Sequence, residues 1–202
     1  MCIRDRALSN HVGVVGPNGL RQAMYLEKVP GFARIILQQF KIHPGDSFLI
    51  FSSTGINGTV IELALLAKAM GLPIVAVTSL QHTSATPSRH PSGKKLAEIA
   101  DITVDNCSPP GDAVTAIEGV PFKIGPVSSI GAIAVVNALK TRTAEMMVER
   151  GVVPTVLTSP HFVGDDVGAE QLENVYDEYF RRVQRAYDGE GAIAVPESWE
   201  TA

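Results

Sequence analysis

The stretch Asp46-Ser47-Phe48-Leu49-Ile50-Phe51-Ser52-Ser53-Thr54-Gly55-Ile56-Asn57-Gly58-Thr59 decides how this chain folds. Its apolar run, 48–51, shows no alternation with polar residues, which is typical of a central parallel strand covered on both faces. The small, hydroxyl-bearing residues that follow predict a loop. The next segment, 59–70, has only Glu62 and Lys68 as charged residues and ends at Gly71. This composition predicts a mostly buried helix with a C-terminal glycine.

A second apolar run, 73–77, follows that helix directly. Residues 47–77 therefore predict one strand–loop–helix–strand unit, and such crossovers are right-handed in nearly all cases. A third strand is expected at 102–104. We predict an α/β fold, a three-layer α/β/α sandwich with a mostly parallel, doubly wound central sheet.

Further elements are expected on both sides of this unit. Helices are predicted at 20–28, 32–40, 93–100 and 128–150, a polar loop at 81–92, a hairpin of 114–117 and 120–124 with a two-residue turn, and a strand at 153–157. Leu172, Val175, Tyr176, Tyr179, Phe180, Val183 and Tyr187 predict an amphipathic helix. We interpret residues 1–6 as a non-native leader, 7–188 as one domain and 189–202 as a flexible tail.

Composition excludes several classes of protein. The chain has 202 residues, 45% of them hydrophobic, with a net charge of -4, which indicates a globular protein without a nucleic-acid surface. No apolar stretch approaches the ~20 residues of a membrane helix, so we expect no membrane contact. Two cysteines without a CxxC pair indicate a reducing compartment, and we predict a cytoplasmic protein. The histidines lack metal-ligand spacing, so neither a metal nor another cofactor is expected.

The loop from Ser52 to Thr59 carries the chemistry. Ligands of open α/β sheets bind beyond the carboxyl ends of the strands, and a helix N-terminus there offers unpaired amide groups to an anion. Gly55 and Gly58 let the backbone approach a ligand closely. The hydroxyls in this loop can donate to phosphate oxygens. The loop contains neither a Walker A nor a GxGxxG sequence. The alternative is a hydroxyl-rich turn with one N-cap and no ligand.

These residues resemble the Ser-x-Ser-Gly loop of SIS (sugar isomerase) domains. The segments 71–79, 95–101 and the helix from Ser128 look similar too. Pro87-Ser88-Arg89-His90-Pro91-Ser92-Gly93-Lys94 resembles the bacterial SIS proteins grouped as UPF0309. SIS domains open with an earlier strand and a Gly-x-Gly-x-Ser loop, which residues 7–33 do not match. We therefore interpret the chain as lacking an N-terminal segment, which would leave an edge or a core face of the sheet exposed.

The resemblance implies a site for a phosphorylated sugar. Its residues, carried over position by position or taken from the loop, are Ser52, Ser53, Thr54, Gly55, Asn57, Gly58, Thr59, Ser79, Arg89, Lys94 and Ser128. It also implies a homodimer or a higher homo-oligomer.

Two functions stay open at this point, namely sugar-phosphate aldose–ketose isomerisation and non-catalytic phosphosugar sensing. A proton-transferring residue is not identified. His82 is either a base or a surface residue, Glu62 is either a base or a capping carboxylate, and Cys107 is expected to be a small buried side chain.

Overall fold

The computed structural model describes residues 21, 22 and 24–201, so the predicted leader lies outside the described residues. The described chain forms two compact units, where one domain over residues 7–188 was expected. The larger unit contains residues 21–135 together with 191–201, and the smaller contains Val136–Glu190.

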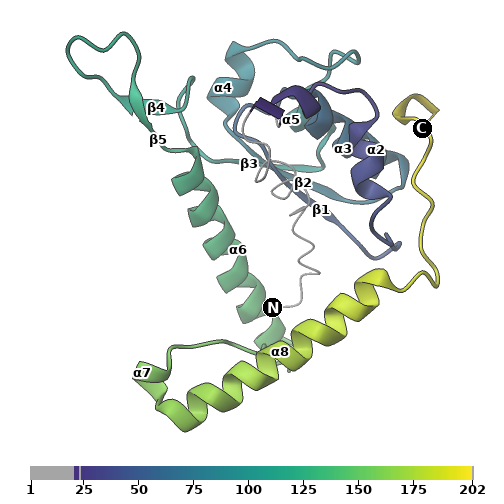
Figure 1. The fold of residues 1–202 in the computed structure, drawn as a ribbon, viewed down its shortest axis with the longest axis vertical. Coiled ribbons are helices and arrows are strands. Elements are labelled where there is room, and N and C mark those ends of the chain that lie inside the picture. Colours follow the sequence, from purple (N-terminus) through teal and green to yellow (C-terminus); the bar gives the residue numbers. More distant parts are fainter. Residues whose placement is uncertain (1–20, 23, 202) are drawn as a thin grey trace. The chain divides into compact units, whose positions relative to one another are not determined.

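The larger unit is built on a parallel sheet. Its strands are β1 (Phe48–Phe51), β2 (Ile74–Thr78) and β3 (Ile102–Asp105), in the order β1-β2-β3 (Figure 1). Both pairings are parallel, with Ile50 opposite Ala76 and Ala76 opposite Thr103. Helices flank this sheet, so the predicted α/β fold is confirmed.

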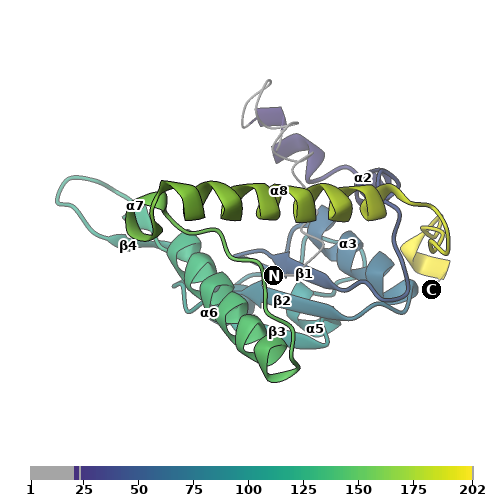
Figure 2. The same cartoon turned by 90° about the horizontal axis from the view of Figure 1, so that it is seen from below.

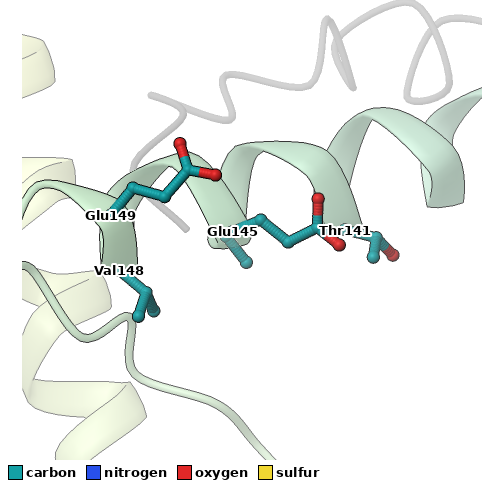
Figure 3. Close-up of a pocket in the computed structure, with 5 residues that line it drawn as sticks. Thr141, Glu145, Val148 and Glu149 are labelled. Atoms are coloured by element: carbon teal, nitrogen blue, oxygen red, sulfur yellow. The ribbon is translucent and has the colours of Figure 1, made fainter.

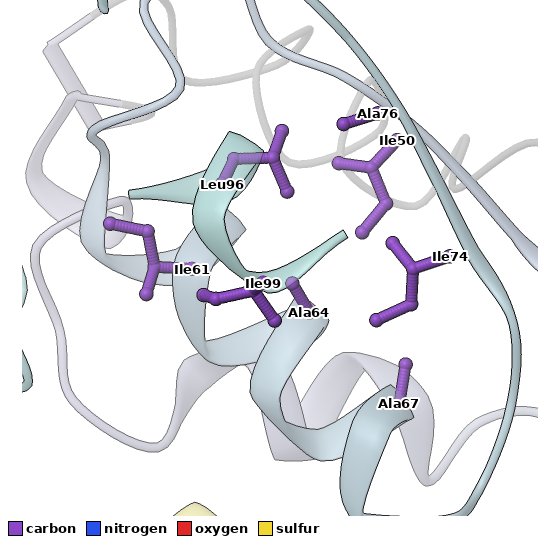
Figure 4. Packing of buried hydrophobic residues seen from close by; sticks show 8 residues of the cluster. All are labelled: Ile50, Ile61, Ala64, Ala67, Ile74, Ala76, Leu96 and Ile99. Carbon is purple, nitrogen blue, oxygen red and sulfur yellow. The ribbon is translucent and has the colours of Figure 1, made fainter. Parts of the chain in front are cut away.

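One face of the sheet is packed against helices α3 (Gly58–Ala69) and α5 (Leu96–Ile99). The cluster, shown in Figure 4, consists of Ile50, Ile61, Ala64, Ala67, Ile74, Ala76, Leu96 and Ile99. Side chains that point to the other side of β1 are more open, since Leu49 and Phe51 are 41% and 40% exposed. Because α3 starts directly after β1, this packing fixes the loop between them at the carboxyl end of the sheet.

A second cluster joins α2 (Phe32–Leu37) and α3 to the C-terminal segment. Ile193 forms a β-bridge with Ile42, and Val195 and Trp199 pack against the same cluster. Trp199 begins the 3₁₀ helix η1 (Trp199–Thr201). Residues 189–202 were expected to be a flexible tail, but the structure places 193–199 against the larger unit.

The remaining elements are α4 (Leu80–Ala85), the antiparallel pair β4 (Ala113–Thr115) and β5 (Ile124–Pro126), α6 (Ser128–Glu149), α7 (Pro160–Val163) and α8 (Asp165–Tyr187). Figure 2 shows α6 and α8 as long helices. No helix in the described part of the chain is long and apolar enough to cross a membrane.

Three local expectations differ from the structure. Residues 80–85 are helical, where a loop was expected, because Ser79 caps this turn. The hairpin exists, but residues 116–123 connect its strands in place of a two-residue turn. Residues 153–157 have no regular secondary structure.

Candidate functional site

The loop between β1 and α3 is fixed by its own backbone and by its neighbours. The N–H of Ser52 donates to the carbonyl of Val77 at 3.0 Å, which continues the pairing of the strands. The Ser52 hydroxyl then accepts the N–H of Gly55 at 3.1 Å. Gly55 is buried with φ 63°, and a Cβ there would lie 2.9 Å from Thr78 Oγ1. A side chain at position 55 would therefore be both strained and crowded.

This loop leaves many donors unused. Within residues 21, 22 and 24–201, no hydrogen-bond partner exists for the backbone N–H groups of Ser53, Thr54, Ile56, Asn57, Gly58 and Val60. The hydroxyl of Thr54 is likewise without a partner in this part of the chain. Backbone N–H groups are nearly always paired when they are buried, so a cluster of unpaired ones indicates contact with water or a ligand. Successive N–H groups in a loop form a concave site for an anion.

The first turn of α3 is only partly available. The backbone carbonyl of Glu27 accepts both the N–H of Thr59, at 3.2 Å, and its hydroxyl, at 3.1 Å. The Glu27 carboxylate accepts a hydrogen bond from Asn57 Nδ2 at 3.2 Å. The structure therefore differs from the expectation that Thr59 and Asn57 offer free polar groups to a phosphate. Gly58 lies between them and retains its N–H.

Two further serines lie at the ends of the neighbouring strands. Ser79, after β2, is fully buried, and its hydroxyl donates to the carbonyl of Ser108 and accepts the N–H of His82. It positions α4 and presents no free hydroxyl. Ser108, after β3, is 3.4 Å from Ser53, oxygen to oxygen. Sequence reasoning missed Ser108, because only the parallel order of the strands brings it beside the loop.

Helix α4 is attached to the same loop. The N–H of Ser79 donates to the carbonyl of Ser53 at 3.0 Å, and the Thr83 hydroxyl donates to the carbonyl of Thr54 at 2.9 Å. Both contacts use carbonyl oxygens, so the loop's N–H groups stay free. Thr83 was not predicted either, since the segment after β2 was expected to be an irregular loop.

The basic segment after α4 touches the loop at one point. The N–H of Arg89 donates to the carbonyl of Ile56 at 3.0 Å, and the Arg89 side chain is exposed without an ion-pair partner in the described part of the chain. Lys94 is also exposed, and its backbone carbonyl and N–H bond to the hydroxyls of Ser88 and Ser92. Lys95, which was not predicted, donates through Nζ to the carbonyl of Thr83 at 2.6 Å. The structure therefore connects Arg89 to the loop directly and gives Lys94 no such contact among the described residues.

Ser128 starts α6 but its hydroxyl is occupied. Asp112 accepts hydrogen bonds from the Ser128 hydroxyl at 2.6 Å and from the N–H groups of Ser128 and Val127 at 2.7 and 3.1 Å. Desolvation of the Asp112 carboxyl opposes ionisation, but the hydrogen bonds from Ser128 and Val127 outweigh it and lower its pKa. The nearby His82 acts in the same direction. Asp112 is therefore the cap of α6, and it occupies the hydroxyl of Ser128 that was expected to contact the ligand.

Other residues weighed from the sequence have structural positions. Glu62 is buried and accepts the N–H groups of Gly31 and Ala33 at 2.8 and 3.2 Å, so it caps α2. Cys107 is exposed, not buried as expected, and its backbone has a positive φ of 58°. Among the described side chains, no group of three or more His, Cys, Asp or Glu residues could hold a metal ion.

A cavity of about 570 Å³ lies beside α6, away from this loop in the sequence (Figure 3). Thr141, Ala144, Glu145, Val148 and Glu149 line it, and all five belong to that one helix. A ligand site generally needs polar groups that converge from several directions. This cavity is therefore not the candidate site.

Comparison with known proteins assigns the chain to a class of domain that agrees with its fold and with the loop between β1 and α3. A family profile described as "SIS domain" matches residues 2–79, which include β1, the loop and β2. The match starts within the segment 1–6 that we interpreted as a leader. The chain is a SIS domain protein.

Its relatives identify the family more closely. It is 33% identical over 171 residues to a UPF0309 protein of Geobacillus thermodenitrificans, and 34% identical over 169 residues to one of Caldanaerobacter subterraneus. These alignments cover 85% and 82% of this chain and 68% and 67% of the relatives. A UPF0309 protein of Streptomyces coelicolor is 34% identical over 175 residues, with 85% and 68% covered. The chain belongs to the UPF0309 family.

Proposed function

We propose that this protein binds a phosphorylated sugar, with the phosphate on the loop 52–58 between β1 and α3. The observation that carries the proposal is the set of N–H groups in this loop that have no partner in the described chain, together with the similarly free hydroxyl of Thr54. Phosphate oxygens accept several hydrogen bonds at once, and the positive end of the α3 dipole adds a favourable field. The SIS domain match supports a sugar phosphate as the ligand.

The surroundings of the loop suit the rest of such a ligand. The Arg89 guanidinium is free within the described chain and its backbone is bonded to the loop at Ile56, so it can supply a positive charge. Ser53 brings a hydroxyl from the end of β1, whereas the hydroxyl of Ser108, at the end of β3, is buried and donates to Asn106 Oδ1 at 2.8 Å. The Glu27 carboxylate at Asn57 is negative, so it disfavours a phosphate beyond that side of the loop. The expected position of the phosphate is therefore nearer Thr54 than Thr59.

The test is a binding titration by thermal unfolding with glucose 6-phosphate, fructose 6-phosphate and N-acetylglucosamine 6-phosphate. Ligand that binds only the folded chain stabilises it by RT ln(1 + [L]/Kd). Thr54→Val keeps the shape of the side chain and removes only its hydroxyl. We expect the variant to bind more weakly by about 10- to 150-fold, the effect of one hydrogen bond to a charged group.

The matched control is Thr103→Val on β3, whose hydroxyl makes only a 3.5 Å contact with the carbonyl of Ala97. It should leave the affinity for sugar phosphates unchanged. If no sugar phosphate raises the unfolding temperature of the unmodified chain, the proposal fails. Equal losses in both variants would place the binding site elsewhere.

Catalysis is a separate question at the same site. Isomerisation of a sugar phosphate moves a proton between adjacent carbons, which requires a titratable side chain near the sugar. Glu27, bonded to Asn57, and His82, next to the loop-bound Thr83, are the two candidates for that role. Incubation with each sugar phosphate in deuterated water discriminates the two functions. Deuterium in the recovered sugar supports an isomerase, and binding without deuterium uptake supports a sensor.

We also propose that the protein forms a homodimer or a higher homo-oligomer. The apolar stripe of α8 is open to solvent in the described chain, with Tyr176 and Phe180 both about half exposed. A monomer at every concentration in sedimentation velocity would contradict this proposal.

A further inference from the structure

We propose that His82 is the residue that recognises the sugar part of the ligand, by a hydrogen bond between Nδ1 and a sugar hydroxyl. This inference rests on the proposed phosphosugar site and deepens it. It starts from one observation, an enclosed polar atom without a partner in the described chain.

The imidazole of His82 has an unusual environment for a polar ring. Its Nδ1 atom is buried, and no hydrogen-bond partner lies near it in the part of the chain that the structure describes. An enclosed nitrogen of this kind loses its hydration without compensation, and such groups are rare in folded proteins. A ligand hydroxyl supplies the missing hydrogen bond.

The position of His82 beside the loop is fixed by its neighbours. Ser79, three residues earlier, donates its N–H to the carbonyl of Ser53, and Thr83, the next residue, donates its hydroxyl to the carbonyl of Thr54. The backbone N–H of His82 donates to the Ser79 hydroxyl at 3.0 Å. The backbone of His82 is therefore anchored independently of its ring. A substitution of the ring therefore leaves these backbone contacts in place.

The charged groups around His82 favour a sugar hydroxyl over a second phosphate. Asp112 lies close enough for its carboxylate to interact electrostatically with His82. Lys95 is bound through Nζ to the carbonyl of Thr83 and is directed to that atom. A negative carboxylate on this side disfavours a second anion, whereas a neutral hydroxyl is tolerated. The phosphate therefore belongs on the loop and the sugar on the side of His82.

Substitution of His82 by asparagine or by glutamine distinguishes the contributions of its two ring nitrogens to binding. The terminal amide of Asn places a polar atom near the position of Nδ1, and that of Gln places one near Nε2. We expect His82→Asn to retain most of the affinity for the sugar phosphate. His82→Gln and His82→Leu should each weaken it by about 2- to 10-fold, the range of one neutral hydrogen bond.

Inorganic phosphate is the probe that isolates this effect. It occupies only the loop, so its affinity should stay unchanged in all three His82 variants and fall in Thr54→Val. A loss of affinity for inorganic phosphate and sugar phosphate by the same factor in His82→Leu would overturn the proposal, as would unchanged sugar-phosphate affinity. If His82→Leu prevents folding, the comparison of His82→Asn with His82→Gln is sufficient. Equal affinities of these two variants for the sugar phosphate would overturn the inference.

Failure of the proposed function has a different signature. In that case neither inorganic phosphate nor any sugar phosphate stabilises the unmodified chain, and Thr54→Val changes nothing. Failure of the His82 inference alone leaves binding of both ligands and its dependence on Thr54 intact.

Discussion

Replacing Gly55 by alanine tests the geometry on which the candidate site depends. Gly55 has φ 63°, and an added Cβ would lie 2.9 Å from Thr78 Oγ1 and 3.2 Å from Thr83 Oγ1. Both hydroxyls are held, because they are 3.1 Å from each other and Thr83 also donates to the carbonyl of Thr54. The crowded atoms therefore cannot move without breaking hydrogen bonds.

The cost has two parts of known size. A left-handed conformation costs an alanine roughly 1–2 kcal/mol, and overpacking of a buried site costs about 1–3 kcal/mol. The sum predicts that Gly55→Ala lowers the free energy of unfolding by about 2–5 kcal/mol. For a chain of this size each kcal/mol lowers Tm by about 2–4 °C, so the expected fall is between about 4 and 20 °C.

The matched control is Gly71→Ala at the end of α3. Gly71 has φ 71°, nearly the same conformation, but among the described residues no heavy atom lies within 4 Å of the position that an added Cβ would take. Only the backbone cost of about 1–2 kcal/mol applies there. Thermal and urea unfolding of both variants measure the difference. If the two substitutions lower stability equally, the close packing of the loop against Thr78 and Thr83 is refuted.

The remaining predictions concern two titratable groups. Because the folded chain lowers the pKa of Asp112 below its ordinary value of 3.8, its stabilisation is present above that pH and is lost as the pH falls through the lower folded pKa. Asp112→Asn should therefore lower the free energy of unfolding at neutral pH and make that free energy less dependent on pH in the acid range. Urea unfolding at a series of pH values measures both effects. An unchanged pH dependence would contradict this role of Asp112. For His90, desolvation lowers the pKa below 6.5 against the opposing effect of Glu62, and the ring of Trp199 lies 4.7 Å away. Trp199→Ala should raise the pKa of His90 in an NMR titration, and no change would exclude Trp199 as a source of the burial.

The sheet could be predicted because its signals are local. The apolar strand β1 and the apolar helix α3 can each be recognised from a few consecutive residues. The alternation of strands with helices along the chain then predicts a parallel sheet. The C-terminal segment could not be predicted in this way. Ile193, Val195 and Trp199 lie among Gly, Pro and Glu residues without periodicity, and their partners are far away in the sequence.

The sequence predicted the position of the candidate site. It did not predict which hydroxyl groups there remain free to bind a ligand. The hydroxyls of Thr59, Ser79 and Ser128 were each expected to face a ligand. Each instead binds a partner that only the folded chain brings near, namely the carbonyls of Glu27 and Ser108 and the carboxylate of Asp112. A hydroxyl in a sequence shows a capacity to donate, whereas its partner depends on tertiary contacts.

The bridge between Ile42 and Ile193 has a consequence for biosynthesis. The ribosome makes residues 136–190, which belong to the smaller unit, before it makes the segment that completes the hydrophobic cluster of the larger one. Until that segment is synthesised, part of the apolar surface of Leu37, Leu66 and Leu72 is exposed to solvent in the nascent chain. A chaperone that shields apolar surface during translation would act on the chain in this interval.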